Sequence, residues 1–259
     1  MTLADHARRA ARISGFVALT PTMLAAYSLR DALSHDPGNS ELRDRWFGAW
    51  CDAMLRVFGI RIVLASSVPA RAEARGRLVV SNHRGVADVL VLLSIFGGRM
   101  VSRADLSKWP LIGLAGRKLG TVFVDREDRR SGAITIRAMR TLLEHGESIT
   151  IFPEGTTFAG DDVRKFHSGG LAAAIGTGAE IVPVGLAYSR DSRAAFLDES
   201  FPEHLSRMAA APPSFVVVSV GAPIDAPART RSSDLAERAR EAVSREVVRA
   251  REEANRRDR

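Results

Sequence analysis

From residue 60 onward, short apolar runs alternate with longer amphipathic stretches. Several runs, such as residues 149–152 and 216–218, are apolar at successive positions, which is typical of strands covered on both faces. The pattern predicts the following strands: 60–64, 78–81, 100–102, 121–124, 148–152, 181–188 and 215–220. Helices are predicted between them at about 86–97, 110–119, 131–145 and 168–177. This alternation indicates an α/β fold with a central mixed, mostly parallel sheet flanked by helices.

The C-terminal part of the chain departs from this alternation. Residues 191–213 are rich in Ala, Ser and Pro, which favours a helical insertion followed by a loop. From residue 232 to the end, small apolar residues recur on one side and charges cover the other. We therefore expect a solvated terminal helix, capped at Ser233, that docks on the domain.

The N-terminal part begins with a charge-free stretch, residues 13–29, which Pro21 interrupts. Its length is at the lower limit for a membrane-spanning helix, so spanning the bilayer and lying on it both remain open. The next predicted helix, 41–58, carries Trp46 and Trp50 on one face, which suits either a membrane interface or packing on the core. Together these segments favour a membrane-associating helical segment at 1–59, followed by an α/β domain with a C-terminal helix at 60–259.

Composition narrows the possible functions. With 259 residues, 46% hydrophobic and 26% charged, the chain is long and apolar enough for a globular domain with a sizeable core. The formal net charge of +7 suits an anionic surface such as acidic lipid head groups, a phosphate-bearing substrate or nucleic acid, although a general preference for Arg accounts for it equally well. The single cysteine, Cys51, excludes an intramolecular disulfide and a cysteine-rich metal site. The histidines lack ligand spacing, so we expect no metal.

The clearest chemical motif is the stretch 81–88, Ser-Asn-His-Arg-Gly-Val-Ala-Asp, which follows an apolar strand and opens a helix. Strand ends and helix starts line the ligand crevice of α/β sheets. Asp88 lies five residues after His83, close enough to accept a hydrogen bond from one imidazole nitrogen and leave the other as a general base. Taken alone, the pair could equally be a helix-start hydrogen bond.

Two further motifs follow predicted strands. Residues 152–157, Phe-Pro-Glu-Gly-Thr-Thr, predict a rigid turn that exposes Glu154 and the backbone amides beyond it, or a plain strand exit. Residues 120–126 lead from a strand into a charged cluster, in which Arg126 either contacts a phosphate or belongs to a solvated loop.

In this order, the motifs resemble those of the glycerolipid acyltransferase family, whose best-known members are the 1-acylglycerol-3-phosphate acyltransferases. The matching blocks are Asn82, His83 and Asp88; Gly120, Phe123 and Arg126; residues 152–156; and the Val-Pro-Val at 182–184. The resemblance covers about residues 60–190. It implies that His83 is the general base, oriented by Asp88, and that the acceptor lipid is bound by Asn82, Arg103, Arg126, Glu154, Gly155, Thr156 and Thr157.

The resemblance also implies the partners. They are a lysolipid acceptor, acyl-CoA or acyl-carrier protein as co-substrate, and a membrane surface at the cytoplasmic face of the inner membrane, with no cofactor and no nucleic acid. The expected reaction moves an acyl group to 1-acylglycerol-3-phosphate and gives phosphatidate. A catalytically silent lipid-binding protein and a thioester hydrolase are the alternatives from other classes.

Two positions depart from the family pattern. Phosphatidate-forming members usually carry Arg directly after Phe-Pro-Glu-Gly-Thr, where this chain has Thr157, and His167 stands where a basic residue is common. A charge-assisted phosphate contact is worth about 1.5–3 kcal/mol, enough to change the preferred acceptor. Both positions resemble relatives that acylate lyso-ornithine lipids, which lack a phosphate, so this acceptor is the alternative.

Overall fold

The computed structural model, which describes residues 2–36, 38–71, 75–125 and 128–259, is built around one seven-stranded sheet. Its strands are β1 (Ile60–Leu64), β2 (Arg77–Ser81), β3 (Arg99–Arg103), β4 (Val122–Val124), β5 (Ser148–Ile151), β6 (Glu180–Tyr188) and β7 (Ser214–Val220). Their order across the sheet is β1-β7-β6-β2-β5-β3-β4. Neighbouring strands pair in parallel except β6 and β7, which are antiparallel. The predicted mixed, mostly parallel sheet is confirmed.

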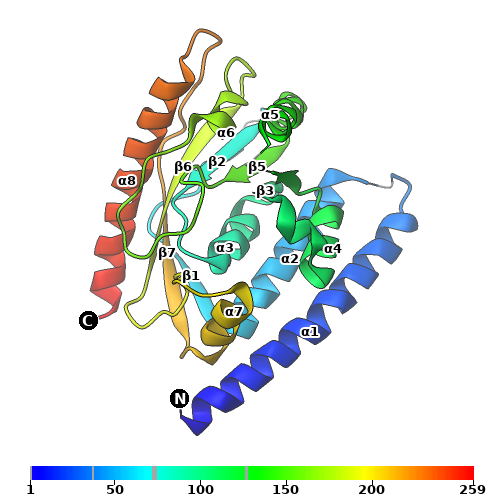
Figure 1. The fold of residues 1–259 in the computed structure, drawn as a ribbon, viewed down its shortest axis with the longest axis vertical. Helices are drawn as coiled ribbons and strands as arrows, with labels where there is room; N and C mark the ends of the chain where they lie inside the picture. Colours follow the sequence, from blue (N-terminus) through cyan, green and yellow to red (C-terminus); the bar gives the residue numbers. More distant parts are fainter. Residues whose placement is uncertain (1, 37, 72–74, 126–127) are drawn as a thin grey trace.

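Helices cover both faces of the sheet (Figure 1). The helices are α1 (Leu3–Ala32), α2 (Ser40–Phe58), α3 (Val86–Phe96), α4 (Pro110–Leu119), α5 (Arg129–Glu144), α6 (Ser168–Ala172), α7 (Phe201–Ala210) and α8 (Ser232–Arg257), with a short 3₁₀ helix at Ala104–Lys108. α5, α6 and α8 pack on one face, and α2, α3 and α7 pack on the other. The apolar runs of β2, β5 and β6 are fully buried between these layers because both of their faces are covered.

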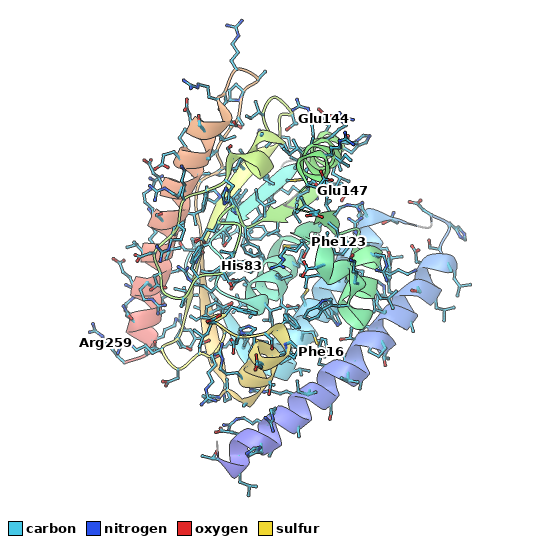
Figure 2. All side chains as sticks on the ribbon, in the orientation of Figure 1. Phe16, His83, Phe123, Glu144, Glu147 and Arg259 are labelled. Carbon is cyan, nitrogen blue, oxygen red and sulfur yellow. The ribbon has the colours of Figure 1, made fainter. Side chains whose placement is uncertain are left out.

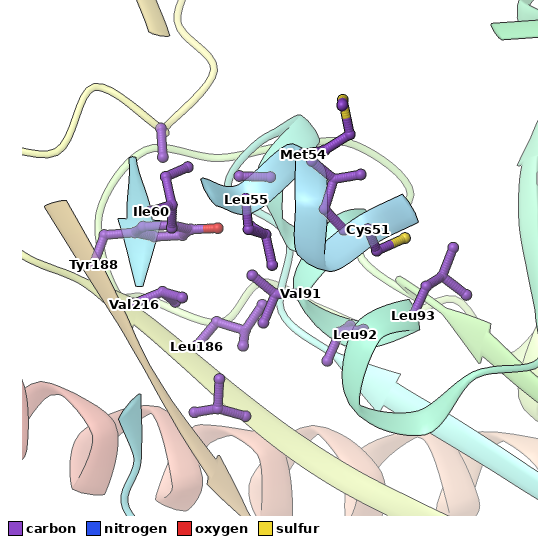
Figure 3. Close-up of a cluster of buried hydrophobic side chains, with 14 of the residues drawn as sticks. Cys51, Met54, Leu55, Ile60, Val91, Leu92, Leu93, Leu186, Tyr188 and Val216 are labelled. Atoms are coloured by element: carbon purple, nitrogen blue, oxygen red, sulfur yellow. The ribbon is translucent and has the colours of Figure 1, made fainter. Parts of the chain in front are cut away.

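The core on the α2–α3 side is shown in Figure 3. Cys51 and Met54 of α2 meet Val91 of α3 and Leu186 of β6 in one apolar cluster. Cys51 is fully buried, and burial raises the pKa of its thiol. Helix α2 thus supplies core side chains to the sheet, while the division of the chain at residue 59 stays a prediction.

Helix α1 runs along the outside of the molecule, against α2, α4 and α7 (Figure 1). It continues through Pro21 as one helix. Trp46 and Trp50 are half-buried between α1 and α2, where the Trp50 indole donates a hydrogen bond to Thr20 Oγ1 at 3.3 Å. Among the described residues, no helix has both the length and the apolar character needed to cross a membrane.

Several predicted boundaries and faces need correction. The tryptophans are not the most buried side of α2: Cys51, Met54 and Phe58 are buried against the sheet, and Phe47 is buried against α1 beside the half-buried Trp46 and Trp50. The N-cap of α8 is Arg231, so the predicted cap at Ser233 is wrong. α6 ends at Ala172, well before the predicted residue 177.

Candidate functional site

The candidate site lies where β2 and β5 end, beside the start of α3. These two strands are adjacent and parallel, so the loops that follow them leave the same edge of the sheet. His83 follows β2, and its side chain is 20% exposed. In Figure 2 it lies near the centre of the molecule, beside α3. The sequence motifs at 81–88 and 152–157 therefore meet at one place.

His83 and Asp88 form the predicted pair. The imidazole Nδ1 lies 2.8 Å from Asp88 Oδ2. Asp88 sits in the first turn of α3 and is fully buried. With Nδ1 donating to the carboxylate, Nε2 is the nitrogen left free to accept a proton. The ring is held flat against Phe152, with ring centroids 3.9 Å apart and an interplanar angle of 7°.

Asp88 accepts hydrogen bonds on both carboxylate oxygens. Oδ2 also accepts from the backbone N–H groups of Arg84 (2.5 Å) and Gly85 (2.9 Å). Oδ1 accepts from the Tyr188 hydroxyl at 2.6 Å. These donors compensate for the loss of water around the buried charge. Tyr188, at the end of β6, belongs to no predicted motif. Its only distinguishing feature in the sequence is a hydroxyl group at the end of a mainly apolar run.

Glu154 joins the two loops of the site. Its Oε1 accepts from the backbone N–H of His83 at 2.8 Å, and its Oε2 accepts from that of Arg164 at 3.1 Å. The residue is 4% exposed, and this burial raises the pKa of its carboxyl. Both of its oxygens are directed at the backbone, so the geometry gives Glu154 a role in holding the base loop instead of the exposed position that the sequence predicted.

Asn82 is also fully buried. Its amide nitrogen donates to the Leu186 carbonyl at 3.1 Å, and its side-chain oxygen accepts from the Leu186 N–H at 2.9 Å. The main-chain pairing of β2 with β6 ends at Ser81, and the Asn82 side chain extends the link between these two chain segments by one step. Its polar groups are thus occupied by β6, and the structure gives no support to the expected substrate contact.

The remaining predicted binding residues are not joined to the base loop by side-chain hydrogen bonds in the described part of the structure. Gly155 has a φ of 81°, which only glycine adopts easily, and the turn leaves Thr156 exposed and Thr157 half-buried. Arg103 is exposed and paired with Asp105, with Nε 3.0 Å from Oδ1. Arg126 lies outside the described residues.

The segment before α7 packs on the base loop, which sequence reasoning missed. The Phe196 N–H donates to the Arg84 carbonyl at 2.6 Å. His204 of α7 is fully buried, stacks on Phe196 with centroids 4.4 Å apart, and lies near Gly85. Burial lowers the pKa of the His204 imidazole. The predicted helical insertion therefore braces the loop that carries His83.

The arrangement suits proton abstraction by His83. Within the described part of the chain, no group of three or more His, Cys, Asp or Glu side chains is placed to hold a metal. A partly exposed imidazole, oriented by a buried carboxylate, can act as a general base for a substrate hydroxyl or for water.

Comparisons with known proteins agree with this chemistry. Residues 61–187 match the family model described as Acyltransferase. The chain is 32% identical to a lyso-ornithine lipid O-acyltransferase of Pseudomonas aeruginosa over 91% of this chain and 90% of that protein. It is 29% identical to a 1-acyl-sn-glycerol-3-phosphate acyltransferase of Neisseria gonorrhoeae over 54% of this chain and 57% of that protein. The crystal structure of the 1-acyl-sn-glycerophosphate acyltransferase PlsC from Thermotoga maritima has the same fold, with a TM-score of 0.73 and 20% identity over 94% of this chain and 96% of that chain. The chain therefore belongs to the acyltransferase family.

Proposed function

We propose that this enzyme transfers a fatty acyl group from acyl-CoA or acyl-carrier protein to the free hydroxyl of a lyso-ornithine lipid. The observation that carries this choice is the extent of similarity. The match to the Pseudomonas aeruginosa lyso-ornithine lipid enzyme covers 91% of this chain, whereas the match to the Neisseria gonorrhoeae 1-acyl-sn-glycerol-3-phosphate enzyme covers 54%. The first expected acceptor, 1-acylglycerol-3-phosphate, becomes the second candidate.

The residue at position 157 supports the same choice. Thr157 stands where a phosphate-binding Arg is usual in the phosphatidate-forming members that the motifs resemble. It is half-buried in the turn after Glu154, close to the loop of the base. A threonine hydroxyl offers no charge to a phosphate, which removes the electrostatic advantage of a phosphate-bearing acceptor.

The proposed mechanism follows from the His83 geometry. Nε2 removes the proton from the acceptor hydroxyl as its oxygen attacks the thioester carbonyl carbon. The carbon–sulfur bond then breaks, the carrier leaves as a thiolate, and the proton on His83 returns to that thiolate. Asp88 stabilises the imidazolium that exists between these steps. Thiolate is a good leaving group, so no covalent acyl-enzyme is needed.

Two acceptors offered side by side test the proposal. Purified protein receives labelled acyl-CoA or acyl-carrier protein with either lyso-ornithine lipid or lysophosphatidate. We expect transfer to lyso-ornithine lipid at a higher kcat/KM, lost in His83→Ala and retained in His145→Ala, an exposed histidine after α5. Preference for lysophosphatidate would overturn the acceptor assignment. Acyl release as free fatty acid, whatever acceptor is added, would instead indicate a hydrolase, and binding without transfer a silent lipid-binding protein.

A charge placed at position 157 tests the basis of acceptor choice. We expect Thr157→Arg to raise kcat/KM for lysophosphatidate relative to lyso-ornithine lipid by about 10- to 100-fold, the value of one charge-assisted hydrogen bond. Thr156→Arg is the matched control, because Thr156 is next to Thr157 in the turn and its side chain is exposed. An equal effect of both variants would mean that general positive charge, and not position 157, decides the acceptor.

We also propose that α1 lies on the cytoplasmic face of the inner membrane. Between Arg12 and Arg30 the exposed side of α1 carries no charge, and Val17 and Leu29 are 51% and 63% exposed. An uncharged helix face of this kind suits the lipid interface. We expect Val17→Asp to weaken binding to anionic liposomes, whereas Val248→Asp, at an equally exposed valine on α8, leaves it unchanged. Equal binding by wild type and both variants would remove α1 from the membrane contact.

A further inference from the structure

Tyr188 contributes a hydroxyl to the buried side of the catalytic pair. Its phenol donates to Asp88 Oδ1 at 2.6 Å, the oxygen that does not face His83. Asp88 is fully buried and Tyr188 is 7% exposed, so water is kept from this hydrogen bond. Short hydrogen bonds to an ionised group in a dry environment are among the stronger ones in proteins.

The Tyr188 ring is held in a fixed position. It packs in the apolar cluster with Val91 and Val216, where Figure 3 shows its hydroxyl at the end of a ring surrounded by apolar side chains. Its backbone carbonyl accepts from Arg251 of α8 at 2.7 Å, and its position in β6 pairs with Val216 of β7. Because neither backbone nor ring has room to move, the hydroxyl fixes the plane of the Asp88 carboxylate.

We propose that Tyr188 is a positioning residue that works through Asp88 to set the orientation and the proton affinity of the base His83. This inference rests on the proposal that His83 is the base. Donation by Tyr188 spreads the negative charge of Asp88, so the carboxylate holds the imidazolium less tightly. Without the hydroxyl, Asp88 retains its bonds to the imidazole and to the backbone of the 83–85 turn, and its charge is directed more strongly at the ring.

Among the described residues, three other titratable or charged groups lie near the His83–Asp88 pair, and they come from three different segments of the chain. Arg84 lies close enough to Tyr188 for its charge to act on the phenol, Glu154 bonds the backbone of His83, and His204 interacts electrostatically with Asp88. Burial, reinforced by the negative charge of Asp88, raises the pKa of the Tyr188 phenol, which keeps the hydroxyl a neutral donor across the assay range. None of these groups replaces a donor at Oδ1.

The test removes the hydroxyl alone. In Tyr188→Phe we expect kcat to fall about 10- to 100-fold at pH 7 with little change in KM, and the acidic limb of the pH–rate profile to move to higher pH. Tyr27→Phe is the matched control, because Tyr27 is the other tyrosine of the chain and its ring is also buried, in the α1–α2 cluster. An unshifted profile in Tyr188→Phe, with or without a loss of rate, would overturn the proposal and leave Tyr188 a structural residue.

A spectroscopic measurement keeps the test independent of the acceptor and of turnover. With Tyr27→Phe as background, Tyr188 is the sole tyrosine, and biosynthetic 3-fluorotyrosine gives one ¹⁹F resonance at that position. We expect this resonance to change with pH while His83 is present, and to stay flat in His83→Ala. A flat resonance with His83 present would refute the coupling. A shifting resonance in a protein that acylates neither acceptor would instead refute the proposed function and retain the coupling.

Discussion

Replacement of Asn82 tests whether this residue holds the sheet or the substrate. The Asn82 side chain is fully buried and makes two hydrogen bonds to the backbone of Leu186. Asn82→Ala leaves the Leu186 N–H and carbonyl without partners in the interior. Each orphaned buried group costs about 1–3 kcal/mol, so we expect the free energy of unfolding to fall by about 2–6 kcal/mol. That loss is large against the usual total of about 5–15 kcal/mol.

Urea denaturation followed by circular dichroism measures this change. With an m-value of about 3 kcal/mol/M, the urea midpoint of Asn82→Ala should fall by about 0.7–2 M. Asn255→Ala on α8 is the control: Asn255 is only half-buried, and its side chain forms no hydrogen bond to any other described residue, so its midpoint should move little.

The Asn82→Asp variant extends the same test, because it predicts the direction in which stability changes with pH. In Asn82→Asp a carboxylate oxygen faces the Leu186 carbonyl at neutral pH, whereas a protonated carboxyl can donate to it. The variant should therefore be less stable at pH 7 than at about pH 5, relative to wild type. If Asn82→Ala unfolds at the wild-type midpoint and loses only acceptor affinity, Asn82 contacts substrate and the structural reasoning is refuted.

Three further predictions concern the loop and its support. Asp88→Asn should lower kcat by about 10²–10⁴-fold in the acyl-transfer assay, because the amide holds the imidazole in the wrong tautomer; activity within tenfold of wild type would contradict this. Gly85→Ala should lose activity and about 1–3 kcal/mol of stability in urea, since an added methyl would lie 2.0 Å from the Ala194 carbonyl oxygen; a fully active, stable variant would be the contrary result. The Arg207 guanidinium holds the pKa of Glu199 down at about 2, so this pair stabilises the fold above pH 4.5 and the effect is lost as pH falls toward 2. Without Arg207 the pKa of Glu199 returns toward its ordinary value, so Arg207→Gln should lower the thermal midpoint at pH 7 and flatten its decline between about pH 4.5 and pH 2. A midpoint–pH curve that matches wild type would remove the pair from acid stability.

Much of the fold follows from the apolar pattern. The run that became β6 is rich in β-branched residues and buried at every position, so its place could be read directly from the sequence. The burial of α2 could not, because the sequence does not show which apolar positions meet the sheet: Cys51 packs in the sheet cluster, whereas Phe47 packs beside Trp46 in the cluster with α1.

The site was predictable to the extent that its residues are close in the sequence. His83 and Asp88 share one helix start, so their contact follows from helix geometry. Tyr188 lies a hundred residues further along the chain and reaches Asp88 only because β6 is next to β2 in the sheet. Glu154 was predicted as a substrate contact, because its two backbone partners, His83 and Arg164, come together with it only in the folded chain.

The two hydrogen bonds of Glu154 close residues 155–163 into a loop whose ends are tied by one side chain. One oxygen fixes the segment of the base, and the other fixes Arg164 at the far end, while the His167 N–H bonds the Pro153 carbonyl at 2.8 Å. Inside the loop the Phe158 N–H also donates to the His83 carbonyl at 3.0 Å, so we expect sequence changes between the anchors to leave the acid–base pair in place only where they spare residue 158. Acceptor choice and proton transfer would then be separable in evolution at the other positions of this one short loop.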